Sequence, residues 1–150
     1  METSGSVKSS YSTNEPLIHA ARIIICGGRH FDDYEHLESV MNEVMSKIEP
    51  WSDVIEIVSG HCEGADQLGE LYASNHGLPC KVFPAQWEKY GRSAGPIRNS
   101  EMVKYASEAV MPVVVAFRSP RTKGTNDTVR KATKLGFKVF VYDYDKGNSC

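Results

Sequence analysis

The chain has 150 residues, of which 41% are hydrophobic and 24% are charged, so it has the composition of a globular domain with a real core and not that of a disordered protein. Seventeen basic and nineteen acidic residues give a formal net charge of −2, so the chain as a whole has no long-range attraction for nucleic acid or an anionic membrane. The four cysteines are far apart and form no C-x-x-C pair, which argues against a zinc ribbon or a thioredoxin-type site.

The N-terminal residues 1–20 are predicted to form a flexible leader, because polar residues dominate and apolar periodicity is absent. They lack the basic and apolar blocks of a signal peptide, and no apolar run reaches membrane-spanning length. We therefore expect a cytoplasmic protein with no membrane partner. A single domain is predicted over residues 21–145, followed by a C-terminal tail over residues 146–150.

Short apolar, β-branched runs alternate with amphipathic segments through the rest of the chain. In chain order, the predicted elements are a strand over residues 22–26, a helix over 37–48, a strand over 54–60, a helix over 64–76, a strand over 81–85, a helix opening near Pro96, a strand over 111–117, a helix over 125–135 and a strand over 137–144. This alternation predicts an α/β fold: a Rossmann-like doubly wound parallel sheet of about five strands in the order 3-2-1-4-5, flanked by helices.

Several side chains are assigned to the core by their spacing. The inward residues of the second and third helices are predicted to be Leu68, Leu71, Tyr72, Met102, Val103 and Ala106. The hydroxyl of Thr125 is a candidate N-cap for the fourth helix, and Cys26 and Cys80 are expected to be small buried residues. The residues Met41, Met45 and Trp51 either belong to the core or form an exposed face for self-association.

Glycine and polar residues gather in the four loops that follow the first four strands, which read GGRHFDDY, SGHCEGAD, WEKYGRSAGPIRN and RSPRTKGTNDT. In a doubly wound sheet, ligands bind beyond the carboxyl ends of the strands, where the strand order reverses. Four such loops at one edge are a stronger signal than any single motif, so the sequence predicts a ligand site there.

The first two loops leave alternatives open. Gly27-Gly28-Arg29 is half of a dinucleotide fingerprint, so it forms either a tight turn or a phosphate contact through Arg29. In the second loop, Asp66 either complements a helix dipole or accepts hydrogen bonds from a ribose hydroxyl pair. His61 and Cys62 lack further ligands for zinc, so no metal site is expected.

The third and fourth loops favour an anion. Two arginines, Arg92 and Arg98, flank the predicted start of a helix, whose free N–H groups attract phosphate or carboxylate. Lys123-Gly124-Thr125 is a second candidate anion cradle, although it is not a Walker loop. Trp87 either stacks on a base or packs over the sheet edge.

The motifs GGRHFDDY, SGHCEGAD, FPAQWEKYGRSAGPIRNSEM and KGT together resemble the YspA-like branch of the SLOG superfamily, a Rossmann-like group related to the DprA and LOG proteins. The resemblance spans roughly Arg22 to Asp143. It implies a nucleotide or nucleotide-derived ligand of the NAD, ADP-ribose or cyclic nucleotide type, no further required cofactor, a role in bacterial or phage conflict, and a homodimer or higher homo-oligomer. The nucleotide contacts that it implies are Gly27, Gly28, Arg29, Ser59, Gly60, Gly64, Asp66, Arg98, Asn99, Gly124 and Thr125, to which the residue patterns add Trp87 and Lys123.

Two alternatives accompany this resemblance. LOG enzymes hydrolyse an N-glycosidic bond with an arginine and a glutamate near P-G-G-x-G-T-x-x-E, but here Thr128 occupies the place of that acid. If this chain is such an enzyme, the candidate catalytic residues are Arg98 with Glu63, Asp66 or Glu101. DprA-like binding of single-stranded DNA is the second alternative, and the net charge disfavours it.

Overall fold

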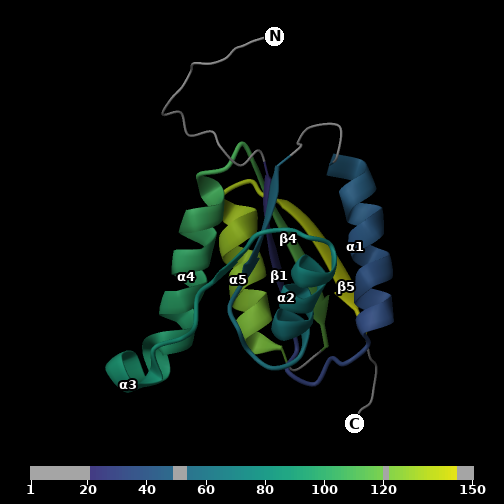
Figure 1. Cartoon of the computed structure of the whole chain (residues 1–150). Coiled ribbons are helices and arrows are strands. Elements are labelled where there is room, and N and C mark those ends of the chain that lie inside the picture. Colours follow the sequence, from purple (N-terminus) through teal and green to yellow (C-terminus); the bar gives the residue numbers. More distant parts are fainter. Residues whose placement is uncertain (1–20, 49–53, 120–121, 145–150) are drawn as a thin grey trace.

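The computed structural model describes residues 21–48, 54–119 and 122–144. The predicted leader, the predicted tail and Trp51 lie outside the described residues. Five parallel strands form one sheet in the order β3-β2-β1-β4-β5, which confirms the predicted topology (Figure 1). The strands are β1 (Ala21–Gly27), β2 (Ile55–Ser59), β3 (Cys80–Val82), β4 (Met111–Arg118) and β5 (Lys138–Asp143).

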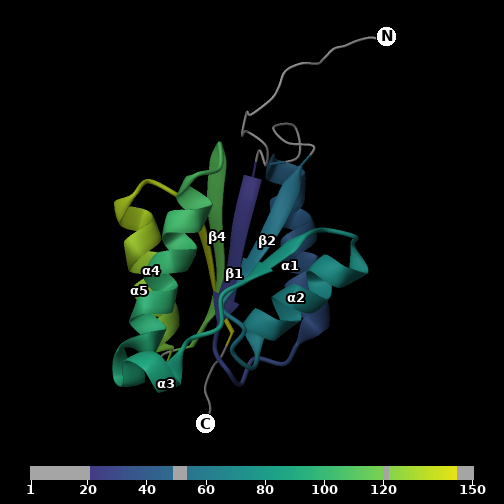
Figure 2. The ribbon, with the colours of Figure 1, turned by 60° about the vertical axis from the view of Figure 1, so that its left-hand side comes forward.

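Helices cover both faces of the sheet, as right-handed crossovers require when the strand order runs away from β1 in two directions. One face carries α1 (Tyr34–Ile48) and α2 (Ala65–Asn75), and the other carries α4 (Ala94–Ser107) and α5 (Lys123–Lys134) (Figure 2). Successive side chains of a strand point to opposite faces, so β1 contributes to two cores. Ile23 and Ile25 pack in the core that includes residues of α1 and α2, while Ile24 and Cys26 pack in the core that includes residues of α4 and α5.

Two predicted helix starts were wrong by two residues. The short helix α3 (Trp87–Tyr90) and the 3₁₀ turn η3 (Gly91–Ser93) lead directly into α4, which therefore begins at Ala94. Pro96 falls in the first turn, where its missing N–H costs no helical hydrogen bond. Similarly, α5 begins at Lys123 with Thr122 at the N-cap position, so Thr125 is buried inside the first turn and is not the cap.

Most predicted core residues are buried, including Met102, Val103 and Ala106. Leu71 was predicted to be buried but is 44% exposed, because the buried side of α2 runs through Ala65, Gly69 and Tyr72 and Leu71 lies opposite.

Cys80 is exposed and not buried as predicted, because it lies on the edge strand β3. Met41 is buried and Met45 packs against the same core, so the core interpretation of these two residues is correct. Within the described ranges, no helix combines the length and the apolar character needed to cross a membrane.

Candidate functional site

The loops that follow β1, β2 and β4 contact one another at the carboxyl ends of the strands, an edge we call the carboxyl edge. The N–H of Gly28 donates to the carbonyl of Phe117 at the end of β4, over 3.0 Å. The N–H of Ala65, the first residue of α2, donates to the carbonyl of Gly28 over 3.2 Å. The sheet order therefore brings together the loops that the sequence marked as unusual.

Three of the predicted ligand contacts, Gly27, Gly28 and Gly64, are glycines at points of close packing. A Cβ at Gly27 would collide with the Phe117 carbonyl and the side chain of Ala65, and a Cβ at Gly28 would collide with the Tyr144 hydroxyl. Gly64 has a φ of 85°, and a Cβ there would collide with backbone atoms of Gly28 and Arg29. Contacts within the protein are thus a sufficient reason for glycine at these three positions.

Arg98 extends from α4 into the protein and is only 8% exposed. Its Nη1 donates to the Gly60 carbonyl over 2.5 Å, its Nε donates to Asn99 Oδ1 over 2.9 Å, and its Nη2 lies 3.6 Å from Cys62 Sγ. The guanidinium therefore joins α4 to the loop after β2.

Asp66 is also buried, at 5% exposure, in the first turn of α2. It accepts a hydrogen bond from the Cys62 N–H over 3.3 Å. A Cβ on Gly60 would lie 2.9 Å from both Asp66 Oδ2 and Arg98 Nη1, so glycine leaves room for both side chains. Burial raises the pKa of the Asp66 carboxyl to about 7, against the lowering effects of the Cys62 N–H and the Arg98 charge. The carboxyl that was a candidate for a ribose hydroxyl pair is thus turned into the protein.

The raised pKa predicts that Asp66 makes the fold less stable as the pH rises. The folded state keeps the proton up to about pH 7, whereas an unfolded aspartate loses it at about pH 4, so this contribution is lost across that interval. We expect Asp66→Asn to remove this loss while keeping an oxygen acceptor for the Cys62 N–H. In urea unfolding, the fall in the free energy of unfolding between about pH 4.5 and about pH 8 should be smaller in the variant by about 2–4 kcal/mol. Identical falls in the two proteins would contradict the prediction.

Asn99 connects α4 to the start of α5. It is buried, and its Nδ2 donates to the Gly124 carbonyl over 3.2 Å and to Asp127 Oδ2 over 3.1 Å. Burial tends to raise the pKa of Asp127, but hydrogen bonds from Lys131 and Asn99 outweigh it and hold the pKa below its usual value. The sequence reasoning missed Asp127, because its role depends on two helices that are distant in sequence.

The remaining predicted ligand contacts differ in their exposure to solvent. Thr125 and Ser59 are buried, while Arg29, Lys123 and Gly124 are exposed. A Cβ at Gly124 would have no neighbour within 4 Å, so the first turn of α5 is open on that side.

Trp87 is 57% exposed, and its indole lies over Gly95, whose Cβ would be 3.6 Å from Trp87 Cη2. The indole therefore packs on α4 and still leaves ring surface free.

A pair of residues that the sequence reasoning did not connect lies in the loop after β2. His61 Nδ1 is 2.8 Å from Glu70 Oε2, and the Ser59 hydroxyl donates to the same oxygen over 2.7 Å. The backbone N–H of His61 donates to Ser59 Oγ over 3.0 Å, and His61 has a φ of 65°. Nothing in the sequence marks Glu70 apart from its position on the helix that follows the loop.

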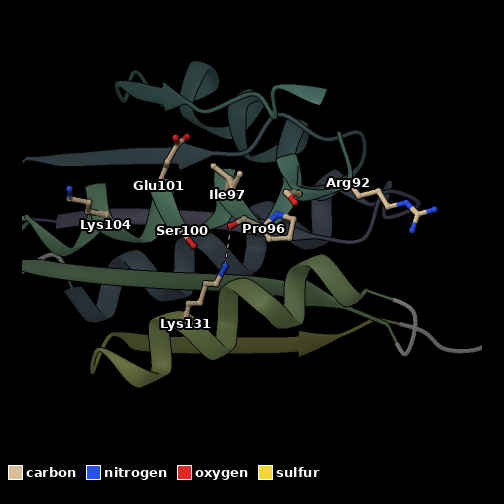
Figure 3. Close-up of a pocket in the computed structure, with 8 residues that line it drawn as sticks. Arg92, Pro96, Ile97, Ser100, Glu101, Lys104 and Lys131 are labelled. Atoms are coloured by element: carbon tan, nitrogen blue, oxygen red, sulfur yellow. Dashed lines mark hydrogen bonds between the residues drawn. The ribbon is translucent and has the colours of Figure 1, made fainter. Parts of the chain in front are cut away.

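An open groove follows the outer face of α4 and has a volume of about 640 Å³ (Figure 3). The residues that line it are Arg92, Ser93, Pro96, Ile97, Ser100, Glu101, Lys104 and Lys131. Lys131 Nζ donates to the Pro96 carbonyl over 3.0 Å, which joins α5 to the first turn of α4. Glu101, a candidate catalytic acid, therefore lies in this exposed groove, whereas the Arg98 guanidinium is buried.

Glu63, the other exposed candidate acid, lies in the loop after β2. Over the residues that the structure describes, no three His, Cys, Asp or Glu side chains are grouped so that they could hold a metal ion.

Comparison with known proteins shows similarity to a protein family and to a phage protein. The model of the YspA, cpYpsA-related SLOG family matches residues 21–90, which run from β1 to α3. The chain is 28% identical over 126 residues to the Gene 61 protein of Mycobacterium phage D29, covering 81% of this chain and 95% of the relative. No solved structure matches the chain. The family match confirms the resemblance seen in the motifs: over residues 21–90, this α/β domain is similar to the YspA-like branch of the SLOG superfamily.

Proposed function

We propose that the domain binds a nucleotide or a nucleotide-derived signal of the NAD, ADP-ribose or cyclic nucleotide type at the carboxyl edge. The observation that carries this proposal is the convergence of helix N-termini on that edge. No side chain of the described residues caps α2, α4 or α5. The N–H of Ala65 in α2 donates to Gly28 and that of Ala94 in α4 donates to Gly91, so the first turn of α5, which is open beside Gly124, is the one best placed to offer N–H groups to an anion. The exposed Arg29 and Lys123 add positive charge beside these turns.

The binding role is favoured over N-glycoside hydrolysis by the placement of the candidate catalytic residues. Arg98 and Asp66 are buried in contacts with the protein, and Glu101 lies in the groove of α4. Thr128, at the place of the LOG glutamate, is 1% exposed. Hydrolysis through Arg98 would need its guanidinium and a carboxylate to face a common open space. Arg98, Asp66 and Glu101 do not provide that arrangement.

We further propose that the domain acts in phage or bacterial conflict as a homodimer or higher homo-oligomer, without another cofactor. The phage origin of the relative supports the first part of this proposal. Binding of single-stranded DNA remains the less favoured alternative because of the net charge of −2.

Native mass spectrometry of the freshly purified protein tests the proposal, followed by calorimetric titration with NAD, ADP-ribose, cyclic AMP, AMP and ATP. An intact nucleotide bound to the protein supports the binding role. Release of a free base during incubation supports the hydrolase instead. Affinity for an oligodeoxynucleotide that falls steeply with salt, together with no affinity for the small molecules, supports the DNA binder.

Lys123→Ala is expected to weaken binding of a phosphate-bearing ligand by about 1.5–3 kcal/mol, the scale of a hydrogen bond to a charged group. The fold should be unaffected because Lys123 is exposed. Lys134→Ala is the matched control, because Lys134 is an exposed lysine at the opposite end of the same helix. Calorimetric titration of both variants is the measurement, and equal affinities would remove Lys123 from the site.

A further inference from the structure

We propose that His61, held by Glu70, accepts a hydrogen bond from a ribose hydroxyl and so makes the carboxyl edge selective for ribonucleotides. The inference rests on the proposed nucleotide binding and deepens it by naming the part of the ligand that the loop after β2 recognises. It assigns the sugar contact to a residue other than Asp66, which is buried.

The position of His61 places it among the groups that form the carboxyl edge. Its neighbours in sequence, Gly60 and Cys62, both contact the Arg98 guanidinium of α4. The loop ends at Gly64, which packs against the backbone of Gly28 and Arg29 in the loop after β1. His61 therefore lies between a contact to α4 and a contact to the loop after β1, while its own side chain is 49% exposed.

The hydrogen bonds of the imidazole determine which nitrogen is free. An ionised carboxylate only accepts hydrogen bonds, so His61 Nδ1 carries a proton toward Glu70 Oε2. In the neutral ring, Nε2 then holds a lone pair, and it has no partner among the described residues. The hydroxyl of Ser59 donates to the same carboxylate oxygen and thereby fixes its position. The result is an oriented acceptor at the surface of the edge.

The backbone of His61 lies at a positive φ, where glycine is the favoured residue. A φ of 65° is costly for a residue with a Cβ, and glycine would adopt it without cost. The hydrogen bond from the His61 N–H to Ser59 Oγ holds this conformation. Residues in unfavourable backbone conformations concentrate at functional sites, which agrees with a ligand contact by the imidazole.

The local charge favours a hydroxyl over a phosphate. Besides Asp66, which keeps its proton up to about pH 7, the loop and the first two turns of α2 carry the carboxyl groups of Glu63 and Glu70. A phosphate beside Glu70 would be repelled, whereas a neutral hydroxyl donor fits a nitrogen lone pair. The phosphate is better placed beside Arg29 and Lys123, so the two ends of the nucleotide have separate contacts.

Equilibrium binding of the four ribonucleoside triphosphates and their 2′,3′-dideoxy counterparts tests the inference. At least one ribonucleotide should bind wild-type protein about tenfold or more tightly than its dideoxy counterpart, because a site that pairs with a hydroxyl rejects the analogue without it. His61→Gly should bind that ribonucleotide as weakly as the dideoxy compound, with the preference reduced to about twofold or less. Its melting temperature should equal or exceed that of the wild type, because glycine relieves the backbone conformation.

His76→Ala is the matched control for this experiment. His76 Nε2 lies 2.8 Å from Glu38 Oε2, so it forms the same kind of pair, but it lies just beyond the C-terminal end of α2. This variant should keep the wild-type preference. A wild-type preference of about twofold or less, or a preference that survives in His61→Gly, overturns the inference while leaving nucleotide binding in place. If wild-type protein binds none of the ribonucleotides and none of the NAD-type ligands, the proposed function fails and the inference fails with it.

Discussion

Gly64→Ala is expected to lower the free energy of unfolding by about 3–5 kcal/mol, because it combines a left-handed backbone with a collision. The φ of 85° is unfavourable for any residue with a Cβ. The added methyl group would also collide with the Gly28 carbonyl and the backbone of Arg29, which cannot move aside by changing a rotamer. The hydrogen bond from Ala65 N–H to the same Gly28 carbonyl should be strained as well. Chemical denaturation of the purified variant measures this cost.

Gly77→Ala separates the two causes. Gly77 also has a positive φ, of 66°, but a Cβ there would meet nothing within 4 Å. Its substitution should cost only about 1 kcal/mol, the conformational part of the effect. Equal costs at the two positions would mean that the loops after β1 and β2 separate easily, and that their contact is not a fixed part of the fold.

Arg98→Ala is expected to cost about 3–5 kcal/mol, the scale of two lost hydrogen bonds from a charged donor to the buried Gly60 carbonyl and Asn99 Oδ1. The Gly60 carbonyl would lose its donor, and the Asp66 carboxyl would lose a nearby positive charge. The pKa of Asp66 should therefore rise further above about 7 in this variant. Denaturation measures the stability, and an NMR titration of the Asp66 carboxyl measures the pKa.

Two further variants test the Arg98 result. Arg98→Lys should recover only part of the loss, since an ammonium cannot reproduce the fork of donors that reaches Gly60, Asn99 and Cys62. Arg92→Ala removes an exposed arginine just before the same helix and should change stability by no more than about 0.5 kcal/mol. Near-wild-type stability of Arg98→Ala would contradict the structural role and would return Arg98 to the candidate ligand contacts.

The sequence predicted the sheet and its order because strand burial depends on local patterns. The run Ile23, Ile24 and Ile25 is apolar on both faces of β1, as a central parallel strand must be, and the helices follow at the expected spacing. Leu71 was misassigned because a spacing of three or four residues selects a face only approximately, and the true buried side of α2 is fixed by its contacts with the sheet.

The sequence predicted where the unusual loops gather but not how their side chains are arranged. The glycine-rich loops after β1, β2 and β4 were correctly predicted to meet at the carboxyl edge, because topology alone brings them together, and binding of a ligand there stays a prediction. Whether Arg98 faces a ligand or Gly60, and whether Asp66 is open or buried, depends on tertiary contacts between residues that are about 30–40 positions apart in the chain. The pairing of His61 with Glu70 could not be read from the motif SGHCEGAD, because Glu70 lies beyond the motif, nine residues after His61 on α2.

The two outer strands also bear on how copies of this domain can associate. An exposed strand edge is a template on which another chain can add a strand, and natural sheets protect such edges with short strands and charged side chains. Here β3 has three residues and an exposed Lys81, and β5 begins and ends with the exposed residues Lys138 and Asp143. Continuation of the sheet from one molecule into the next is therefore disfavoured at both edges. The outer faces of the helices are better suited to a symmetric assembly of this domain, because an isologous contact there closes on itself and does not grow into a fibre.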